Sequence, residues 1–140
     1  MASDDQLAEI RADIDSIDKQ LLALINARAE CARRVAEIKL AASQNGDALF
    51  YRPEREAQIL RAIQERNPGP LPPDQAARIF REIMSSCLAL ERPLTVGFLG
   101  PVGTYSQAAA LKPFGQSAIL EPQPTIRDVF RLSEDRACDM

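Results

Sequence analysis

One long helical pattern, from Leu7 to about Ala42, constrains this chain more than any other feature. No proline or glycine interrupts it before Gly46. A helix of about 36 residues is about 54 Å long, whereas a domain of about 100 residues has a radius of gyration of about 13 Å. The chain cannot cover such a helix along its whole length, so we expect a second copy to cover the remainder. The apolar residues recur at helical spacing and are Ile10, Ile14, Ile17, Leu21, Leu24, Ile25, Val35 and Ile38.

Three cations, Arg11, Arg28 and Lys39, lie on or near this apolar stripe. Arg28 and Lys39 share a face of the helix and lie about 16 Å apart along its axis, so their long side chains can converge on one small anion. Arg11 is about 25 Å from Arg28 and cannot reach that anion within one chain. In an antiparallel dimer, Arg11 of one chain could approach Arg28 and Lys39 of the other. The plain alternative is that all three are solvated surface cations.

Composition excludes several classes of protein. The apolar fraction of 46% is ordinary for a soluble globular protein. A net charge of −3 and a pI near 5.0 argue against a nucleic-acid partner. No apolar run approaches the length of about 18 residues that a membrane span needs, so we expect no membrane partner. The acidic first residues lack the apolar core of a signal peptide.

Cysteine and histidine usage narrows the chemistry. The three cysteines, Cys31, Cys87 and Cys138, have no metal-ligand spacing and are odd in number, so we expect a reduced, cytoplasmic protein. The chain contains no histidine, which removes the most common general base and the most common zinc ligand. We expect no metal and no cofactor. An enzyme built from this sequence would use carboxylates, cations and hydrogen bonds.

Start and stop signals divide residues 7–92 into three helices, of which the first is much the longest. Acidic residues and proline favour helix starts, whereas glycine and proline clusters favour helix ends. In chain order the signals are a cap at residues 3–5, a break at 43–47, a start at Pro53, a stop at 67–73, a start at Asp74 and a stop at Pro93. The inner face of the third helix is predicted to carry Ile79, Phe80, Ile83, Met84, Cys87 and Leu88.

The pattern changes at Leu94 to that of an α/β segment. About 47 residues are too few for a doubly wound sheet with its own core, and a two-stranded sheet is marginal in water. We therefore expect residues 94–140 to be mobile or weakly docked. The predicted elements are a strand at 94–99, a turn at 100–103, a helix capped by Thr104 and ending near Lys112, a strand at 117–120, and a last helix with Thr125 and Asp128 as its capping pair.

Two further charged or polar pairs are candidate site residues. Arg55 and Glu56 begin the second helix and could grip a substrate carboxylate and hydroxyl. Their alternative is an ordinary charged helix start. Cys87 and Glu91 are one turn apart near the end of the third helix. Cys87 could instead be a small core residue, and Glu91 an exposed residue at a fraying end.

Together these residues resemble the all-helical chorismate mutase domain. The resemblance covers residues 7–92 and is carried by LAEIRADIDSIDKQLLALINAR, VAEIK, YRPERE and IFREIMSSCLALE. It implies an all-α fold, with a three-helix chorismate mutase domain at residues 1–92 that forms an interlocked helical dimer, followed by a truncated α/β segment at 93–140. In that family the long first helix runs through both halves of the dimer, and each site takes one arginine from the other chain.

The resemblance also implies a role for single residues. Arg28, together with Arg11 of the partner chain, would bind the two carboxylates of chorismate. Lys39 would reach the ether oxygen that gains negative charge as the C–O bond breaks, and Glu91 would face the same oxygen. Glu56 would accept a hydrogen bond from the ring hydroxyl. Arg28, Lys39 and Glu91 are thus the predicted catalytic residues.

Three other positions complete the predicted substrate-binding set. The resemblance assigns Arg55 to the cationic wall near the carboxylates. Arg52 falls where some members have an aspartate near the hydroxyl, and Cys87 falls where some have a serine. These two departures leave the polar contacts at that edge of the pocket open.

Residues 96–115, VGFLGPVGTYSQAAALKPFG, resemble the start of a prephenate dehydratase domain. The order of the two resemblances is that of bifunctional enzymes of phenylalanine biosynthesis. A phosphate-loop reading of GPVGTYS lacks the required lysine and glycine spacing. We expect a truncated chain without dehydratase activity. The alternative function is a helical dimerisation or regulatory module without catalysis, which explains the long helix but not the charged residues at matching positions.

Overall fold

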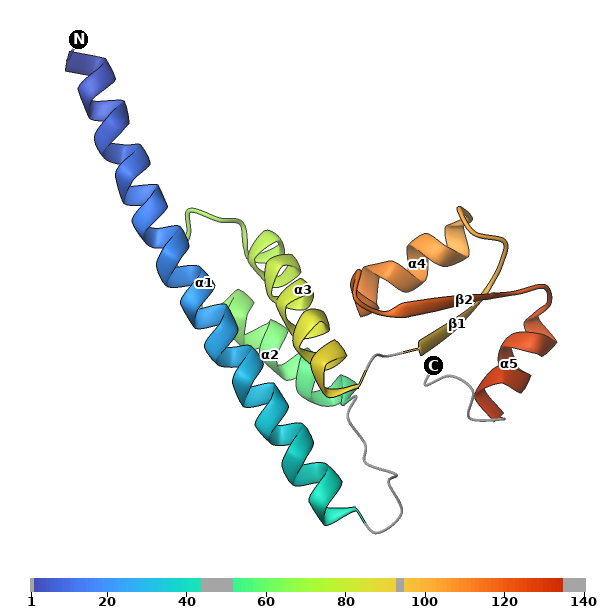
Figure 1. The fold of residues 1–140 in the computed structure, drawn as a ribbon. Coiled ribbons are helices and arrows are strands. Elements are labelled where there is room, and N and C mark those ends of the chain that lie inside the picture. Colours follow the sequence, from blue (N-terminus) through green and yellow to red (C-terminus); the bar gives the residue numbers. More distant parts are fainter. Residues whose placement is uncertain (1, 44–51, 93–94, 135–140) are drawn as a thin grey trace.

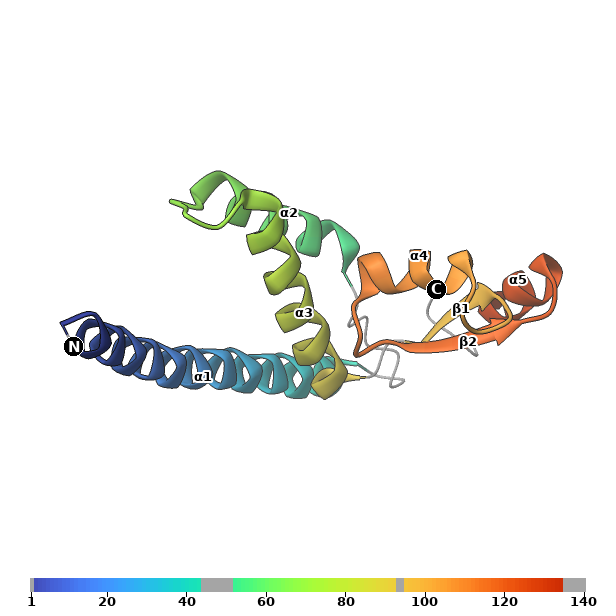
Figure 2. The same cartoon turned by 90° about the horizontal axis from the view of Figure 1, so that it is seen from above.

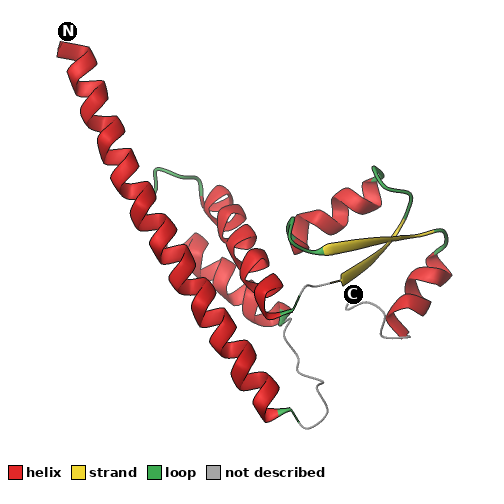
Figure 3. Ribbon diagram, in the orientation of Figure 1, coloured by secondary structure: helices red, strands yellow, loops and turns green. Residues whose placement is uncertain are grey.

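The protein, seen in a computed structural model, has a helical part followed by a small α/β segment (Figures 1 and 3). The structure describes residues 2–43, 52–92 and 95–134. The predicted order of three helices and then an α/β segment is confirmed. The elements are α1 (Ala2–Ala42), α2 (Pro53–Arg66), α3 (Pro73–Glu91), β1 (Thr95–Leu99), α4 (Tyr105–Phe114), β2 (Ile119–Gln123) and α5 (Ile126–Glu134).

Helix α1 is longer than its apolar pattern predicts. It contains 41 residues and begins at Ala2, so the expected cap at residues 3–5 is wrong, because these residues already lie inside the helix. Asp4 and Asp5 occupy the first turn, where they favour the positive end of the helix dipole. At 1.5 Å per residue, α1 is about 61 Å long. Its first turns extend beyond the other helices (Figure 1).

Helix α3 holds the other two helices of the helical part together. It packs on α1 and on α2, whereas the described backbones of α1 and α2 do not approach one another. Figure 2 shows α3 between the other two helices. The contacts are made by small or flexible residues, and no large side chain of the described chain is fully buried. The buried residues of these helices are Ala32, Ala36, Ala76, Ala77, Met84, Ser85 and Cys87.

The first half of α1 exposes an unpartnered apolar stripe. Its residues alternate in steps of three and four, the heptad spacing with which one helix packs along another. Each side chain is between 49% and 67% exposed. An apolar patch of this extent indicates an interaction surface rather than a solvated face. The stripe consists of Leu7, Ile10, Ile14, Ile17, Leu21 and Leu24.

The α/β segment is one strand–helix–strand unit with a further helix. Strands β1 and β2 pair in parallel, from Thr95 opposite Ile119 to Leu99 opposite Gln123. Parallel strands need a crossover connection, and α4 supplies it. Val96 and Phe98 alternate along β1 and are buried. Helices α4 and α5 both pack against the strands, and α4 also contacts α3.

The two predicted caps of this segment differ in outcome. At α5, the hydroxyl of Thr125 donates to Asp128 Oδ2 at 2.7 Å and accepts the Asp128 amide at 3.1 Å, which confirms the capping pair. Thr104 occupies the N-cap position of α4 but makes no capping hydrogen bond. The side chain of Gln107 makes a hydrogen bond in this turn instead, because its Oε1 accepts a hydrogen bond from the Gly103 amide at 2.6 Å. The predicted N-cap position of Thr104 is therefore confirmed, but a capping hydrogen bond from its side chain is not formed.

Among the described residues, none of the helices combines the length and the apolar character that crossing a bilayer requires.

Candidate active site

A cavity of about 390 Å³ lies between the second half of α1, the start of α2 and the end of α3. This volume falls in the range of small-molecule sites, about 300 to 1,000 Å³. All the predicted site residues except Arg11 line it. The charged lining residues are Arg28, Lys39, Arg52, Arg55, Glu56 and Glu91. The apolar and thiol lining residues are Cys31, Ala32, Val35, Ile59, Met84, Cys87 and Leu88.

Helix α1 supplies one wall through its own periodicity. Arg28, Ala32, Val35 and Lys39 follow one another at steps of three or four residues, which places them on one face. Arg28 and Lys39 are half-buried there. Cys31 shares this face and was missed as a lining residue by sequence reasoning, although the same spacing from Arg28 could have identified it.

The start of α2 supplies a second, more exposed wall. Pro53 occupies the first turn, as predicted, and Arg52 is the residue that precedes it. Glu56 is half-buried, whereas Arg55 is exposed at the cavity edge. The Nε of Arg52 donates to Glu54 Oε1 at 3.0 Å, in an ion pair whose two side chains are more than half exposed. Such exposed pairs contribute little stability, so Arg52 can change partner when an anion enters.

The end of α3 supplies the third wall. Met84, Cys87, Leu88 and Glu91 lie at helical spacing and face the cavity. Cys87 is buried as a free thiol, so it is at once a core residue and a lining residue. Glu91 is half-buried rather than exposed. Its Oε2 is buried without a hydrogen-bond partner, although a buried carboxyl oxygen normally has one.

Burial raises the pKa of both lining carboxyls. It raises the pKa of Glu91 above the usual range, although Lys39 and then Arg28 oppose the rise. It likewise raises the pKa of Glu56, against the attraction of Arg81 and Arg28. The sequence alone left the direction for Glu91 open, because burial and cations act in opposite senses. The structure shows that burial dominates at both positions.

The cavity wall is electropositive whether these carboxyls are protonated or ionised. Four cations and two carboxyls line it, so the net charge of the lining is positive in either state. A positive, partly enclosed wall attracts anions of small size. Its arrangement suits a ligand that carries carboxylates and that also needs a hydrogen-bond donor and an acceptor.

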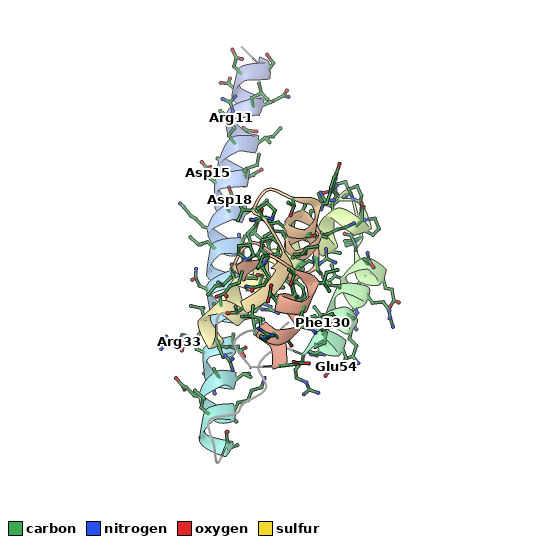
Figure 4. The ribbon with its side chains drawn as sticks, turned by 90° about the vertical axis from the view of Figure 1, so that its right-hand side faces the viewer. Arg11, Asp15, Asp18, Arg33, Glu54 and Phe130 are labelled. Atoms are coloured by element: carbon green, nitrogen blue, oxygen red, sulfur yellow. The ribbon has the colours of Figure 1, made fainter. Side chains whose placement is uncertain are left out.

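Arg11 lies far from this cavity. It is exposed on the part of α1 that projects past the other helices (Figure 4). Along the helix it is about 25 Å from Arg28. The structure of one chain therefore does not bring Arg11 together with the other predicted site residues.

Residues 10–92, more than half of the chain, match the family described as chorismate mutase type II. Residues 96–140 match the family described as prephenate dehydratase. The chain is 56% identical over 132 residues to the bifunctional chorismate mutase/prephenate dehydratase of Stutzerimonas stutzeri, and 55% identical over 132 residues to that of Pseudomonas aeruginosa. Each alignment covers 94% of this chain.

A third relative of the same description, from Neisseria gonorrhoeae, is 48% identical over 136 residues, or 97% of this chain. The chain spans 36% of the length of each of these relatives. The family match covers all three helices that enclose the cavity, and the chain therefore belongs to the chorismate mutase type II family.

Proposed function

We propose that the helical part of this protein converts chorismate to prephenate, as a step in the biosynthesis of aromatic amino acids, including phenylalanine. The observation that carries the proposal is the cavity, in which four cations and two carboxyls of raised pKa face one another. Chorismate carries two carboxylates, a ring hydroxyl and an ether oxygen. Each of these groups has a counterpart of suitable charge or hydrogen-bonding capacity among the lining residues.

The cations of the cavity would bind and orient the substrate. Arg28 would hold one carboxylate, with Arg55 close by, and a guanidinium can do so through two parallel hydrogen bonds. Arg52 lies at the rim in an exposed ion pair, from which it could turn to the substrate. Glu56 would accept a hydrogen bond from the ring hydroxyl. These contacts favour the compact conformer in which the reacting carbon atoms approach one another.

Lys39 and Glu91 would act at the ether oxygen. This oxygen gains negative charge as the C–O bond breaks, and preorganised donors stabilise that charge more in the transition state than in the substrate. The protonated form of Glu91 can donate a hydrogen bond, whereas the ionised form cannot. Its buried, unpartnered Oε2 and its raised pKa support the protonated form as the active one.

The rearrangement is intramolecular, so it requires neither a nucleophile nor a proton shuttle. Positioning of the substrate and electrostatic stabilisation of the transition state are sufficient to catalyse such a reaction. A site made of arginines, a lysine and carboxyls is therefore adequate for the chemistry. A dimerisation module without catalysis is the competing function, and it gives no reason for these charged side chains to surround one cavity.

We also propose that the protein is a homodimer in which α1 of one chain packs antiparallel against the other chain. A groove of about 880 Å³ lies beside the cavity, with a lining from α1, α2 and α3. Its apolar lining residues are Leu21, Leu24, Ile25, Ile59, Ala62, Ile63, Pro68, Leu71, Ala76, Ile79, Phe80 and Ile83. The exposed heptad stripe of α1 is of the kind that fills such a groove.

The groove also gives Arg11 a route to the site. Groove and cavity share Arg28, Arg55 and Ile59 as lining residues, so a helix in the groove ends beside the cavity. The first half of the partner's α1 would bring Arg11 there, to hold the second carboxylate. This arrangement covers the exposed stripe and completes the site at the same time.

The reaction would take place in the cytoplasm. Cys31 and Cys87 are free thiols, as is usual for proteins of a reducing compartment.

In the decisive experiment, the purified protein is incubated with chorismate, and the decrease in the absorbance of chorismate is recorded over time. We expect turnover, and we expect Arg28→Ala to lower kcat/KM by about 10²- to 10³-fold. Arg33→Ala is the matched control, because Arg33 lies on the same helix, is exposed and pairs with Glu30 at 3.1 Å. A wild-type protein that leaves chorismate unchanged would favour the dimerisation module.

A further inference from the structure

Helix α3 has a second side, which faces away from the cavity. Successive residues of a helix are rotated by about 100°. The cavity side of α3 carries Met84, Cys87 and Glu91, so Glu82 and Ser85 point away from it. This outer side faces the connection between α4 and β2, and α3 and α4 are in contact there.

Three hydrogen bonds join the outer side of α3 to this connection. The Ser85 hydroxyl donates to the Phe114 carbonyl oxygen at 2.8 Å. The Gln116 amide donates to Glu82 Oε2 at 3.2 Å. The hydroxyls of Ser86 and Ser117 are 3.3 Å apart. These partners are 29 to 34 residues apart in the chain, so the bonds fix one part of the molecule on another.

Gly115 lies in the middle of this contact and is buried. Its φ of 75° and ψ of 175° belong to a region that is essentially open only to glycine. A Cβ at this position would lie 2.6 Å from Ser85 Cβ and 2.7 Å from Ser85 Oγ. Glycine is thus required twice, once by the backbone conformation and once by the closeness of α3.

We propose that Glu82, Ser85 and Ser86 form an intramolecular docking surface for residues 114–117, and that docking depends on the absence of a side chain at Gly115. The α/β segment is then held on the helical part, in contrast to the mobile or weakly docked segment that its size suggests. Docking uses the side of α3 opposite the cavity. It therefore leaves the cavity open to its ligand.

Gly103 provides a matched control for Gly115. Its φ is 87°, so an alanine there also meets the strain of a positive φ. A Cβ at Gly103 has nothing within 4 Å, whereas one at Gly115 meets Ser85. The two glycines belong to the same segment, at opposite ends of α4. A difference between Gly115→Ala and Gly103→Ala therefore reports the contact with α3 rather than the strain alone.

The test is hydrogen exchange at the Gln116 amide, measured by NMR on the full chain. We expect slow exchange in the wild type and in Gly103→Ala. Gly115→Ala should accelerate it by about tenfold or more, equivalent to about 1.4 kcal/mol. It should also increase chymotrypsin cleavage after Phe114, at the bond to residue 115 itself. Chorismate turnover should stay within about twofold, because Gly115 does not contact the cavity.

A second variant separates the clash from general damage to the fold. Ser85→Gly removes the two nearest atoms that an alanine at position 115 would meet, so Gly115→Ala should accelerate exchange less in the Ser85→Gly background than in the wild type. Ser85→Gly alone measures the effect of glycine within α3 together with the loss of the hydrogen bond to Phe114. Unprotected exchange at Gln116 in the wild type would overturn the inference, as would equal exchange in Gly115→Ala and Gly103→Ala, or an effect of Gly115→Ala that is as large in the Ser85→Gly background as in the wild type. Because the readout does not depend on chorismate, failure here would leave the proposed function intact.

Discussion

The same three helices enclose two hollows of contrasting character. The cavity measures about 390 Å³ and carries six charged side chains, whereas the groove measures about 880 Å³ and is lined mainly by leucine, isoleucine and other apolar residues. They meet at Arg28, Arg55 and Ile59. The difference shows how neighbouring stretches of one helix surface can be suited to different occupants, in this case a small anion and an apolar helix.

The division between the two hollows lies on α1 itself. Leu21 and Leu24 line the groove, and the same stripe continues through Arg28 into the cavity, where it carries Val35. The heptad spacing is unbroken across this boundary. The residue chemistry changes at Arg28, where a cation follows the apolar residues of the stripe, so the site would form where the proposed dimer seam ends.

The largest expected effect comes from placing a charge in the groove. Leu24→Asp should raise the dimer dissociation constant by about 10²-fold or more, because burying one leucine contributes about 1.5 to 3 kcal/mol and a two-fold dimer contains the substitution twice. Turnover at low protein concentration should disappear with the dimer. Sedimentation and the chorismate assay measure the two effects together.

Leu22 provides the control for this experiment. It is 63% exposed in one chain, close to the 67% of Leu24, but it does not line the groove. Leu22→Asp should therefore leave the dimer and its turnover nearly unchanged. Equal effects of the two substitutions, or a stable monomer that retains full activity, would show that the groove is not part of a dimer interface.

The next prediction tests whether each cavity receives Arg11 from the other chain. Arg11→Ala and Arg28→Ala homodimers should each lose about 10²- to 10³-fold in turnover. Equal amounts, unfolded and refolded together, should recover about a quarter of wild-type activity, because half of the dimers are mixed and one of their two sites has both arginines.

A tag on each variant makes the mixed dimer measurable. If mixed dimers form but no activity returns, Arg11 does not serve the partner's cavity. Recovery without mixed dimers would mean that the regained activity does not come from a site shared between chains. Two samples of Arg28→Ala that carry different tags control for the effect of refolding alone.

The smallest effect concerns the cavity alone and depends on pH. Because burial raises the pKa of Glu91, its protonated form persists to higher pH than that of an ordinary carboxyl. In the proposed mechanism only this form would donate to the ether oxygen, so kcat/KM should fall by up to about 10²-fold as pH rises through that pKa. Glu91→Gln should flatten the fall, because an amide donates at every pH.

The same ionisation has a consequence for folding. A carboxyl whose pKa is raised in the folded state stabilises the fold below the pKa of the unfolded chain, and this contribution is lost as pH rises through the folded-state value. Glu91→Gln should remove that part of the pH dependence of the free energy of unfolding. A wild-type rate profile that is flat from acid to neutral pH, or a fall that Glu91→Gln leaves in place, would exclude this role for Glu91.

Much of the helical part could be predicted from local pattern. The three helices, the start of α2 at Pro53 and the common face of Arg28 and Lys39 all depend on periodicity and on residues within about one turn of each other. Such local relations do not depend on what packs around the helix. The same reasoning led to the Thr125–Asp128 cap, whose partners are three residues apart.

Local pattern failed where a competing partner was available. The expected cap at residues 3–5 is wrong because no helix breaker precedes it and α1 continues to Ala2. Thr104 has the residue type and backbone position of a cap, yet Gln107 binds the turn in its place. In each case the sequence allowed more than one local solution.

The sequence by itself determined which side chains share a helix face, and hence which charges could gather. Only the tertiary structure decided that burial outweighs Lys39 and Arg28 at Glu91, because desolvation depends on everything packed around a group. It alone brought Gly115 against Ser85, since that approach joins positions 30 residues apart and depends on how α3 and α4 lie.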